Sequence, residues 1–437
     1  MKYYSTSHSC PEASLEEAVI RGLAPDKGLY MPRTIPTLPA SFIEALPSMS
    51  LTEAATGVAK ALFGEDIPGS DLESIVESTL SFDCPVVKVK EGIYSLELFH
   101  GPTLAFKDVG ARFMARMLSY LLSHRKGGAS QSVNVLVATS GDTGSAVANG
   151  FLGVEGVRVF VLYPKGRVSP VQESQIATLG QNITALQVEG NFDDCQALVK
   201  AAFMDGDLRS AMLLTSANSI NLARFLPQSF YYFGAYAALR AMGHKEDIVA
   251  CVPSGNFGNI CSGLIGKRMG LPIKRFIASN NLNDVFFQYL RSGVYSPRES
   301  IATYANAMDV GAPSNFARIL DLYGGSVNEI RKDIEGYVVD DDTILRTMKE
   351  CLDENGYLLD PHGACAYRAL SEGIKDGEVG FFCETAHPAK FPEVVMKATL
   401  TQAPQPERLT AFLGRKKESV TIGKDFPSFK EFLLSVG

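Results

Sequence analysis

The chain has 437 residues, of which 46% are hydrophobic and 20% are charged; this is typical of a soluble globular protein with two or three domains and excludes disorder of the whole chain. The formal net charge of −7 is spread without long runs of one sign, so nothing indicates nucleic acid or an acidic membrane as a partner. No stretch of about 18 apolar residues is available to span a bilayer, and the N-terminus lacks the apolar core of a signal peptide. We therefore expect a cytoplasmic protein, a monomer or a homodimer, that acts on a small molecule.

The eight cysteines form no C-x-x-C pair, and no histidine stands beside them at the spacing of a metal site. Cys251 and Cys383 end strand-like runs, where small apolar residues pack in the core, so packing is favoured over a role as nucleophile. We expect reduced, mostly buried thiols and no bound metal.

Residues 1–95 are expected to form helices separated by proline-rich loops. The segment SLEEAVIRGL has a helical pattern. Prolines then punctuate the chain at Pro25, Pro32, Pro36 and Pro39. Such a segment packs on a larger body, so we expect a helical N-terminal extension.

From residue 133 the pattern changes to strand, glycine-containing loop and helix. Apolar runs predict strands over 134–140, 157–164, 183–190 and 212–216, with helices between them. A helical stretch over 220–243 precedes further strands over 247–253, 273–281 and 377–384. Alternation of this kind predicts parallel sheets covered by helices.

The fold class is therefore α/β, with two doubly wound parallel-sheet domains. We expect the N-terminal extension over 1–95, a smaller α/β domain over 96–235, and a larger α/β domain over 236–437 that is completed by C-terminal helices.

Lys107 lies where a short apolar run meets an amphipathic helix. Beside Leu104, Ala105 and Phe106, its amine is expected to be partly desolvated, which lowers the pKa of an amine and frees its lone pair to attack a carbonyl. Such a lysine can form a Schiff base. The alternative is a lysine that extends its amine to solvent at a helix start.

Two loops follow predicted strands and open helices. The loop SGNFGN, residues 254–259, places backbone N–H groups at a helix N-terminus, where a phosphate is favoured. The loop ATSGDTG, residues 138–144, adds three hydroxyls that can donate to a carboxylate. The alternatives are a plain strand-to-helix turn for the first loop, and helix capping by Ser140 or Asp142 for the second.

Two further segments carry polar groups to the ends of strands. Residues 216–224 bring Asn218, Ser219 and Arg224 to a helix start, and arginine is suited to bidentate phosphate binding; the alternative is a surface cap with a solvated arginine. Residues 384–390 follow a buried strand and contain Thr385 and Lys390. Ligands bind at the carboxyl ends of parallel strands. A reactive amine, two anion-binding loops and a further arginine together suit an aldehyde cofactor that carries a phosphate, namely pyridoxal 5'-phosphate (PLP), and an anionic amino-acid substrate.

Motifs in order along almost the whole chain carry a family resemblance. They are GLAPDKGLYMP, ELFHGPTLAFKD, ATSGDTGSA, YPKGRVSP, EGNFDDCQALVK, NSINLARFLPQ, PSGNFGN, NAMDVGAPSNF, DPHGACAY and ETAHPAKFP. The chain resembles the threonine synthases of the longer-chain class, in the fold-type II group of PLP enzymes, whose fold is like that of tryptophan synthase β. The resemblance implies a mobile smaller domain that carries the substrate carboxylate loop and a larger domain that carries the cofactor phosphate loop.

The resemblance also implies residue roles. Lys107 would be the catalytic residue and would bind the cofactor as a Schiff base. Thr385 would hydrogen-bond the pyridine nitrogen through a neutral hydroxyl. The cofactor phosphate would be held by Ser254, Gly255, Asn256, Phe257, Gly258 and Asn259. The substrate carboxylate would be bound by Thr139, Ser140, Asp142 and Thr143, and the substrate phosphate by Asn218, Ser219, Arg224 and Lys390. Several related enzymes carry Asn at the position of Asp142, and a carboxylate there repels a substrate carboxylate, which favours the hydroxyls and amides of that loop.

The implied reaction converts O-phospho-L-homoserine and water into L-threonine and phosphate, by γ-elimination followed by β-addition of water. An alternative on the same scaffold is a PLP-dependent phospho-lyase or dehydratase that yields 2-oxobutyrate. A non-catalytic ligand-binding protein is a further alternative, but it predicts a lost lysine or a degraded phosphate loop, and both are intact here.

Overall fold

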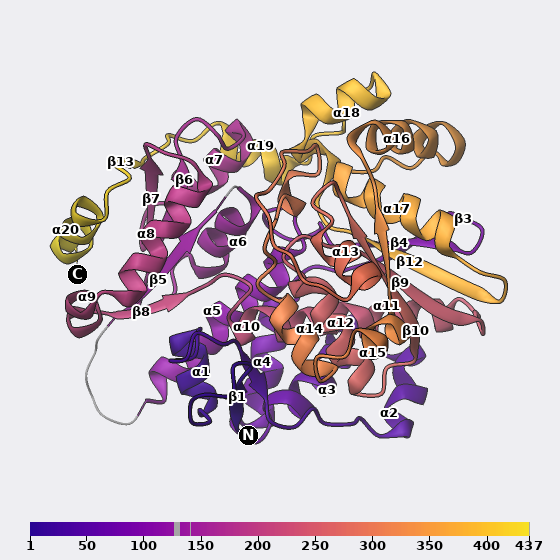
Figure 1. The fold of residues 1–437 in the computed structure, drawn as a ribbon, viewed down its shortest axis with the longest axis horizontal. Coiled ribbons are helices and arrows are strands. Elements are labelled where there is room, and N and C mark those ends of the chain that lie inside the picture. The colour runs from indigo at the N-terminus through magenta and orange to yellow at the C-terminus, as the bar shows by residue number, and fades with distance from the viewer. Residues whose placement is uncertain (126–131, 140, 437) are drawn as a thin grey trace. The chain divides into compact units, whose positions relative to one another are not determined.

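The structure is a computed structural model that describes residues 1–125, 132–139 and 141–436. The chain forms two compact units, each built from segments far apart in the sequence (Figure 1). The large unit contains residue 1, Met31–Phe106 and Phe225–Gln405, and the small unit contains Lys2–Tyr30, Lys107–Arg224 and Pro406–Gly437.

The large unit is built on a six-stranded sheet in the order β11-β10-β9-β12-β4-β3. Neighbouring strands are parallel except for β3 and β4, which form an antiparallel edge. Most strand residues are buried, which is typical of a parallel sheet covered on both faces. The strands are β3 (Val86–Lys90), β4 (Ile93–Glu97), β9 (Asp247–Pro253), β10 (Ile273–Asn280), β11 (Ile334–Val338) and β12 (Glu378–Glu384).

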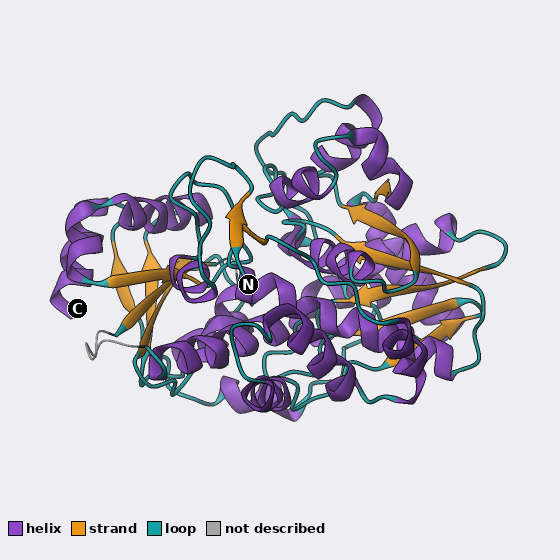
Figure 2. Ribbon diagram, turned by 90° about the horizontal axis from the view of Figure 1, so that it is seen from below, coloured by secondary structure: helices purple, strands orange, loops and turns teal. Residues whose placement is uncertain are grey.

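Helices cover this sheet on both faces (Figure 2). One face packs against α17, and aromatic side chains of the other face, Phe276 and Phe381, contact Tyr232 of α11. The helices of the large unit are α2 (Ala40–Ala45), η1 (Leu46–Ser48), α3 (Leu51–Phe63), α4 (Gly69–Thr79), η2 (Leu226–Gln228), α11 (Ser229–Ala241), α12 (Gly258–Arg268), α13 (Val285–Ser292), η3 (Asn306–Met308), α14 (Phe316–Leu322), α15 (Val327–Asp333), α16 (Asp341–Asn355), α17 (Pro361–Gly373), η4 (Pro388–Lys390) and α18 (Pro392–Thr399).

The small unit is built on a five-stranded parallel sheet in the order β13-β7-β6-β5-β8. Its strands are β5 (Val133–Ala138), β6 (Val157–Pro164), β7 (Ile183–Val188), β8 (Leu213–Ser216) and β13 (Val420–Ile422). Its helices are α1 (Leu15–Arg21), α5 (Lys107–Ser123), α6 (Asp142–Phe151), α7 (Pro170–Ala177), α8 (Phe192–Met204), α9 (Gly206–Ala211), α10 (Leu222–Phe225), α19 (Glu407–Leu413) and α20 (Phe426–Val436). The short strands β1 (Tyr3–Ser5) and β2 (Tyr30–Pro32) lie near the N-terminus.

The strands predicted from apolar runs are confirmed, with ends that differ by a few residues. Several parts of the chain differ from expectation. Residues 96–106 and 225–235, expected in the smaller domain, belong to the large unit, and Lys2–Tyr30 of the expected N-terminal extension belongs to the small unit. Residues 86–97, of which 86–95 are expected in the helical extension, form the hairpin β3–β4 instead, and Gly92 provides its positive φ of 71°. Residues 406–437, placed in the larger domain, belong to the small unit, because Ile422, Phe429 and Leu433 pack into its apolar core.

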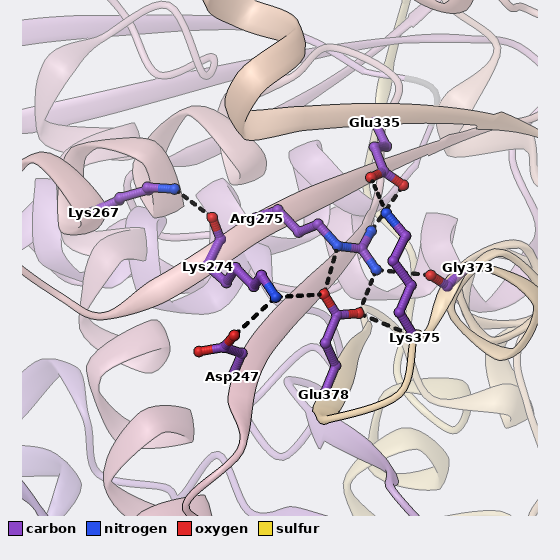
Figure 3. Close-up of polar contacts among 8 residues, drawn as sticks. All are labelled: Asp247, Lys267, Lys274, Arg275, Glu335, Gly373, Lys375 and Glu378. Carbon is purple, nitrogen blue, oxygen red and sulfur yellow. Dashed lines mark hydrogen bonds and ion pairs between the residues drawn. The ribbon is translucent and has the colours of Figure 1, made fainter.

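An ion-pair network fastens the amino ends of the strands in the large unit (Figure 3). Arg275 of β10 donates through Nε and Nη2 to the carboxylate of Glu378 at 3.1 and 2.6 Å, and through Nη1 to Glu335 at 2.9 Å. Lys274 pairs with Asp247 at 2.8 Å. The network therefore joins the starts of β9, β10, β11 and β12, while the loops at their carboxyl ends are left to bind ligands.

Among the described residues, no helix combines the length and the apolar character needed to cross a bilayer.

Candidate active site

The turn between β9 and α12, residues 254–257, has open hydrogen-bond donors. Phe257, at the N-cap of α12, has a left-handed backbone with φ 62°, and no side chain caps this helix. Among the described residues, no hydrogen bond is donated by the backbone N–H of Gly255, Phe257 or Gly258. A helix N-terminus with unsatisfied N–H groups attracts anions, so the β9–α12 turn can bind a phosphate.

The β9–α12 turn packs against a later segment of the same unit. A methyl group on Gly255 would lie 2.7 Å from Cα of Met308 and 2.9 Å from the carbonyl oxygen of Ala307. Asn256 accepts a hydrogen bond from the N–H of Ser314 through Oδ1 at 2.6 Å. The segment around residues 307–315 therefore fixes the backbone of the turn, and only glycine permits this approach at position 255.

The side chains of Ser254 and Asn259 point to structural partners. The hydroxyl of Ser254 donates to the carbonyl of Val252 at 2.9 Å. Oδ1 of Asn259 accepts from the hydroxyls of Tyr231 and Tyr232, each at 2.7 Å, whereas its buried Nδ2 has no hydrogen-bond partner among the described residues. These two residues thus anchor the turn to the sheet and to α11.

Thr385 lies at the same edge of the sheet as the β9–α12 turn. In the pairing of β12 with β9, Phe382 is opposite Cys251, so Thr385 and Ser254 follow neighbouring strands at the same level. Thr385 is 7% exposed, and its carbonyl accepts from the N–H of Phe106 at 2.9 Å. The residue that precedes Lys107 is therefore tied to this strand end.

Lys390 is buried in the large unit. It ends η4, its side chain is 1% exposed, and Nζ donates to the carbonyl of Thr103 at 2.9 Å. The ammonium group thus fixes the segment that leads to Lys107, a contact that sequence analysis did not anticipate.

In the small unit, Lys107 is the first residue of α5 and is half-buried. The next residue, Asp108, is 1% exposed. Arg224 is 2% exposed and lies against the same helical turn, because a methyl group on Gly110 would come within 3.3 Å of Nε of Arg224. An amine, a buried carboxyl group and a buried guanidinium group therefore gather at the start of α5.

The charge of Arg224 is retained despite its burial. Burial lowers the pKa of the guanidinium group to about 10, and the nearby charge of Asp108 opposes this shift. Arg224 also donates through Nη1 to the carbonyl of Ala217. The side chain is thus positively charged at neutral pH and held in one orientation.

Thr139, in the loop after β5, caps the start of α6, although capping was expected from Ser140 or Asp142. Oγ1 of Thr139 accepts from the N–H groups of Gly141 and Gly144 at 2.9 and 2.8 Å. Asp142 is 6% exposed and accepts from Nε2 of Gln172 at 3.0 Å through Oδ1, and Thr143 is half-buried. Ser140, the other capping candidate, lies outside the described residues.

The loop after β8 lies beside the loop after β5, because β5 and β8 are neighbours in the sheet, with Leu136 opposite Ser216. Asn218 and Ser219 are half-buried, and Oδ1 of Asn218 has no hydrogen-bond partner among the described residues. Nδ2 of Asn221 donates to the carbonyls of Val19 and Ser216 at 2.8 and 3.1 Å. The N-terminal helix α1 thus supports this loop.

Sequence reasoning missed Asp108, Gln172 and Asn315 as supporting residues. Asp108 stands inside the motif AFKD, so an acid beside a candidate catalytic lysine was a usable signal. Gln172 and Asn315 act across 30 and 59 residues of sequence, and no local pattern reveals such contacts.

Comparison with known proteins finds matches along the chain. Residues 83–381 match the family described as pyridoxal-phosphate dependent enzyme, residues 2–80 match the threonine synthase N terminus, and residues 363–433 match the threonine synthase C-terminal region. The chain is 43% identical over 434 residues to the threonine synthase of Haemophilus influenzae, with 99% of this chain and 100% of the relative covered.

Solved structures give the same result. The crystal structure of threonine synthase from Escherichia coli superposes with a TM-score of 0.92 at 40% identity and covers 100% of both chains. The X-ray structure of PLP-bound threonine synthase from Brucella melitensis superposes with a TM-score of 0.93 at 36% identity, covering 100% of this chain and 99% of the other.

Proposed function

Because this chain belongs to the threonine synthases, pyridoxal-phosphate-dependent lyases of fold type II, we propose that it converts O-phospho-L-homoserine and water into L-threonine and phosphate. The fold class expected from the sequence is confirmed by the two parallel sheets and by the solved structures. The observation that carries the proposal lies at the start of α5, where Arg224 packs against the helical turn that begins with Lys107. An amine and a buried cation suit a substrate with an acidic Cα–H at one end and a phosphate at the other.

The residues present fit PLP. The phosphate of PLP needs several N–H donors, and the uncapped N-terminus of α12 offers the backbone of Gly255, Phe257 and Gly258. With them, Ser254, Asn256 and Asn259 are the residues that would hold the cofactor phosphate. Thr385 would donate or accept one neutral hydrogen bond at the ring nitrogen, and Nζ of Lys107 would hold the aldehyde carbon. When bound, PLP supplies an electron sink for negative charge that develops on substrate carbons.

Lys107 is proposed to move protons at two substrate atoms. With substrate bound, Nζ of Lys107 would remove the proton from Cα and would then move a proton at Cβ. Its place at the first position of α5, directly after the Phe106–Thr385 hydrogen bond, supports a fixed position for the amine.

Arg224 is proposed to stabilise the phosphate that leaves from Cγ. A charged donor oriented before the reaction lowers the energy of a developing anion without reorganisation at that moment. Asn218 and Ser219 lie on the loop that leads to Arg224, and the half-buried Asn218 offers a neutral amide donor. Lys390 is also proposed to contribute to binding of the substrate phosphate.

The substrate carboxylate is proposed to bind at the loop after β5. Thr139, Ser140 and Thr143 offer hydroxyl groups there. Asp142 is already engaged by Gln172, which supports a structural role for this carboxyl group and agrees with the repulsion expected between two carboxylates.

The test is product analysis with purified protein. Incubation with PLP and O-phospho-L-homoserine should yield threonine and inorganic phosphate in equal amounts, and release of phosphate with 2-oxobutyrate and ammonia in place of threonine would contradict the proposal. The Lys107→Ala variant should lose turnover and the visible absorption band of bound PLP. The control is Lys200→Ala, on the exposed side of α8, which should keep both.

We also propose a cytoplasmic location and a monomeric or homodimeric state without nucleic-acid partners. All eight cysteines are free, which suits a reducing compartment. Light scattering of the purified protein at several concentrations would decide between monomer and dimer.

A further inference from the structure

Arg318 is a buried cation close to the β9–α12 turn. The side chain is fully buried, at 0% exposed, and belongs to α14. Its guanidinium carbon lies 3.8 Å from the centre of the Phe225 ring, and Nη1 donates to Oδ1 of Asn315 at 2.6 Å. Burial lowers the pKa of Arg318 to about 9, so the group remains charged at neutral pH but at a cost in free energy.

Asn315 links this cation to the turn. It is also fully buried, and Nδ2 donates to the backbone carbonyl of Asn256 at 3.0 Å. The amide thus has its oxygen toward the guanidinium group and its nitrogen toward the turn. The assignment of oxygen and nitrogen follows from the partners, since Arg318 can only donate and a carbonyl can only accept.

The series of hydrogen bonds ends at the N–H of Phe257, which points away from Asn315. In a trans peptide the carbonyl of Asn256 and the N–H of Phe257 point in opposite directions, so a hydrogen bond received by this carbonyl leaves the N–H directed away from Asn315. That N–H donates to no group among the described residues. Hydrogen bonds in a chain polarise one another, and a positive charge at the far end therefore strengthens the N–H as an anion donor.

We infer that Arg318 is a positioning residue for the cofactor phosphate, because it supplies a positive charge behind the β9–α12 turn and transmits it through Asn315. The inference rests on the proposed role of this turn in PLP binding. Arg318 does not touch the phosphate in this arrangement; it orients Asn315 and favours a dianion on the far side of the turn.

The experiment compares PLP with pyridoxal, which has the same ring and aldehyde but no phosphate. Full-length protein freed of cofactor is titrated with each ligand, and binding is followed by absorbance. Arg318→Met, which keeps the volume and removes the charge, should weaken PLP binding by about tenfold or more and leave pyridoxal binding within about twofold. An equal loss for both ligands would overturn the inference, because it would show a merely structural role.

A second variant keeps the test valid if Arg318→Met does not fold. Asn315→Asp places a carboxylate against Arg318, which satisfies the buried cation but neutralises it and removes the donor to Asn256. Unfolding of the cofactor-free variant by urea should be unchanged or shifted to higher concentration, while the ratio of PLP to pyridoxal affinity should fall by about tenfold. An unchanged ratio would contradict the inference.

The matched control is Arg268→Met. Arg268 is an exposed arginine at the end of α12, over the ring of Tyr323 at 4.9 Å, and its removal should leave the affinity ratio unchanged. Absence of PLP binding in the unmodified protein would instead refute the proposed function, so failure of the inference and failure of the function give different results.

Discussion

Arg224 is a buried cation whose position is fixed by its neighbours. Its guanidinium group donates to the Ala217 carbonyl and packs against Gly110, and the negative charge of Asp108 favours its charged form. Residues held in this way need little reorganisation when a charge develops nearby. The first turn of α5 thus fixes both Lys107 and the cation proposed for the substrate phosphate.

We predict that Arg224→Met lowers turnover of O-phospho-L-homoserine by about 10²- to 10³-fold, the loss typical of one transition-state charge contact. PLP should remain bound, because Arg224 is not part of the β9–α12 turn, which is proposed to hold the cofactor phosphate. Steady-state kinetics and the absorbance of bound PLP check both statements. The control is Arg116→Met on α5, where Arg116 is half-buried, and this change should alter turnover little. Loss of PLP in Arg224→Met would instead assign Arg224 to the cofactor site.

The residue types of the candidate site could be predicted from the sequence, but several of the hydrogen bonds that these residues form could not. Lys107, Thr385 and the glycines at 255 and 258 lie at strand ends or helix starts, as the sequence predicted. The capping role of Thr139 and the Lys390–Thr103 hydrogen bond were not foreseen, because each depends on the local path of a loop rather than on residue type. The catalytic and binding roles themselves stay predictions.

At the level of elements, the β9–α12 turn depends on a close approach of two backbones. We predict that Gly255→Ala destabilises the large unit by about 1–3 kcal/mol, the usual cost of overpacking, since the added methyl would meet backbone atoms of Met308 and Ala307. PLP affinity should fall in parallel. Urea unfolding and PLP titration are the measurements.

Gly206→Ala is the control for this substitution. Position 206 begins α9, and a methyl group there would meet nothing within 4 Å. Alanine in a helix is favoured over glycine by roughly 0.5–1 kcal/mol, so stability should hold or rise. If both glycine variants behaved alike, the close approach at Gly255 would not be the cause.

For the whole molecule, the Arg275–Glu378 pair is the clearest stabilising contact at the amino ends of the strands (Figure 3). The two side chains are 7% and 1% exposed. Breaking a buried pair by removing one charge typically costs about 3–5 kcal/mol, and we predict a loss of this size for Glu378→Gln in urea unfolding. Glu329→Gln, in the exposed pair with Lys332, should cost less than about 1 kcal/mol.

The same pair predicts a pH dependence of stability. Burial raises the pKa of Glu378, but hydrogen bonds from Arg275 and the Lys375 N–H, with the charge of Arg275, outweigh burial and hold it below the ordinary value of 4.5. The unfolded chain therefore binds more protons below about pH 4.5. This contribution is fully present above that pH and is lost as pH falls through the folded-state pKa; Glu378→Gln should show a smaller acid loss in unfolding curves from pH 3 to 7.

Much of the fold could be predicted because apolar runs and glycine loops alternate clearly between residues 133 and 281. The hairpin of residues 86–97 was not predicted because Lys88 and Lys90 alternate with valines. This is the pattern of a half-exposed edge strand rather than of a buried strand. Strand β13 has three residues, two of them exposed, and is fixed by pairing with β7 rather than by its own sequence.

The dependence of residues 254–257 on Met308, Ser314 and Asn315 also bears on synthesis. When residue 259 has been translated, the polypeptide already contains the glycine motif but not residues 308–315, which fix the backbone of the turn. If this turn holds the cofactor phosphate as proposed, a nascent chain cannot bind the coenzyme until it extends beyond residue 315, and a fragment that ends earlier would contain the glycine motif without a formed anion site.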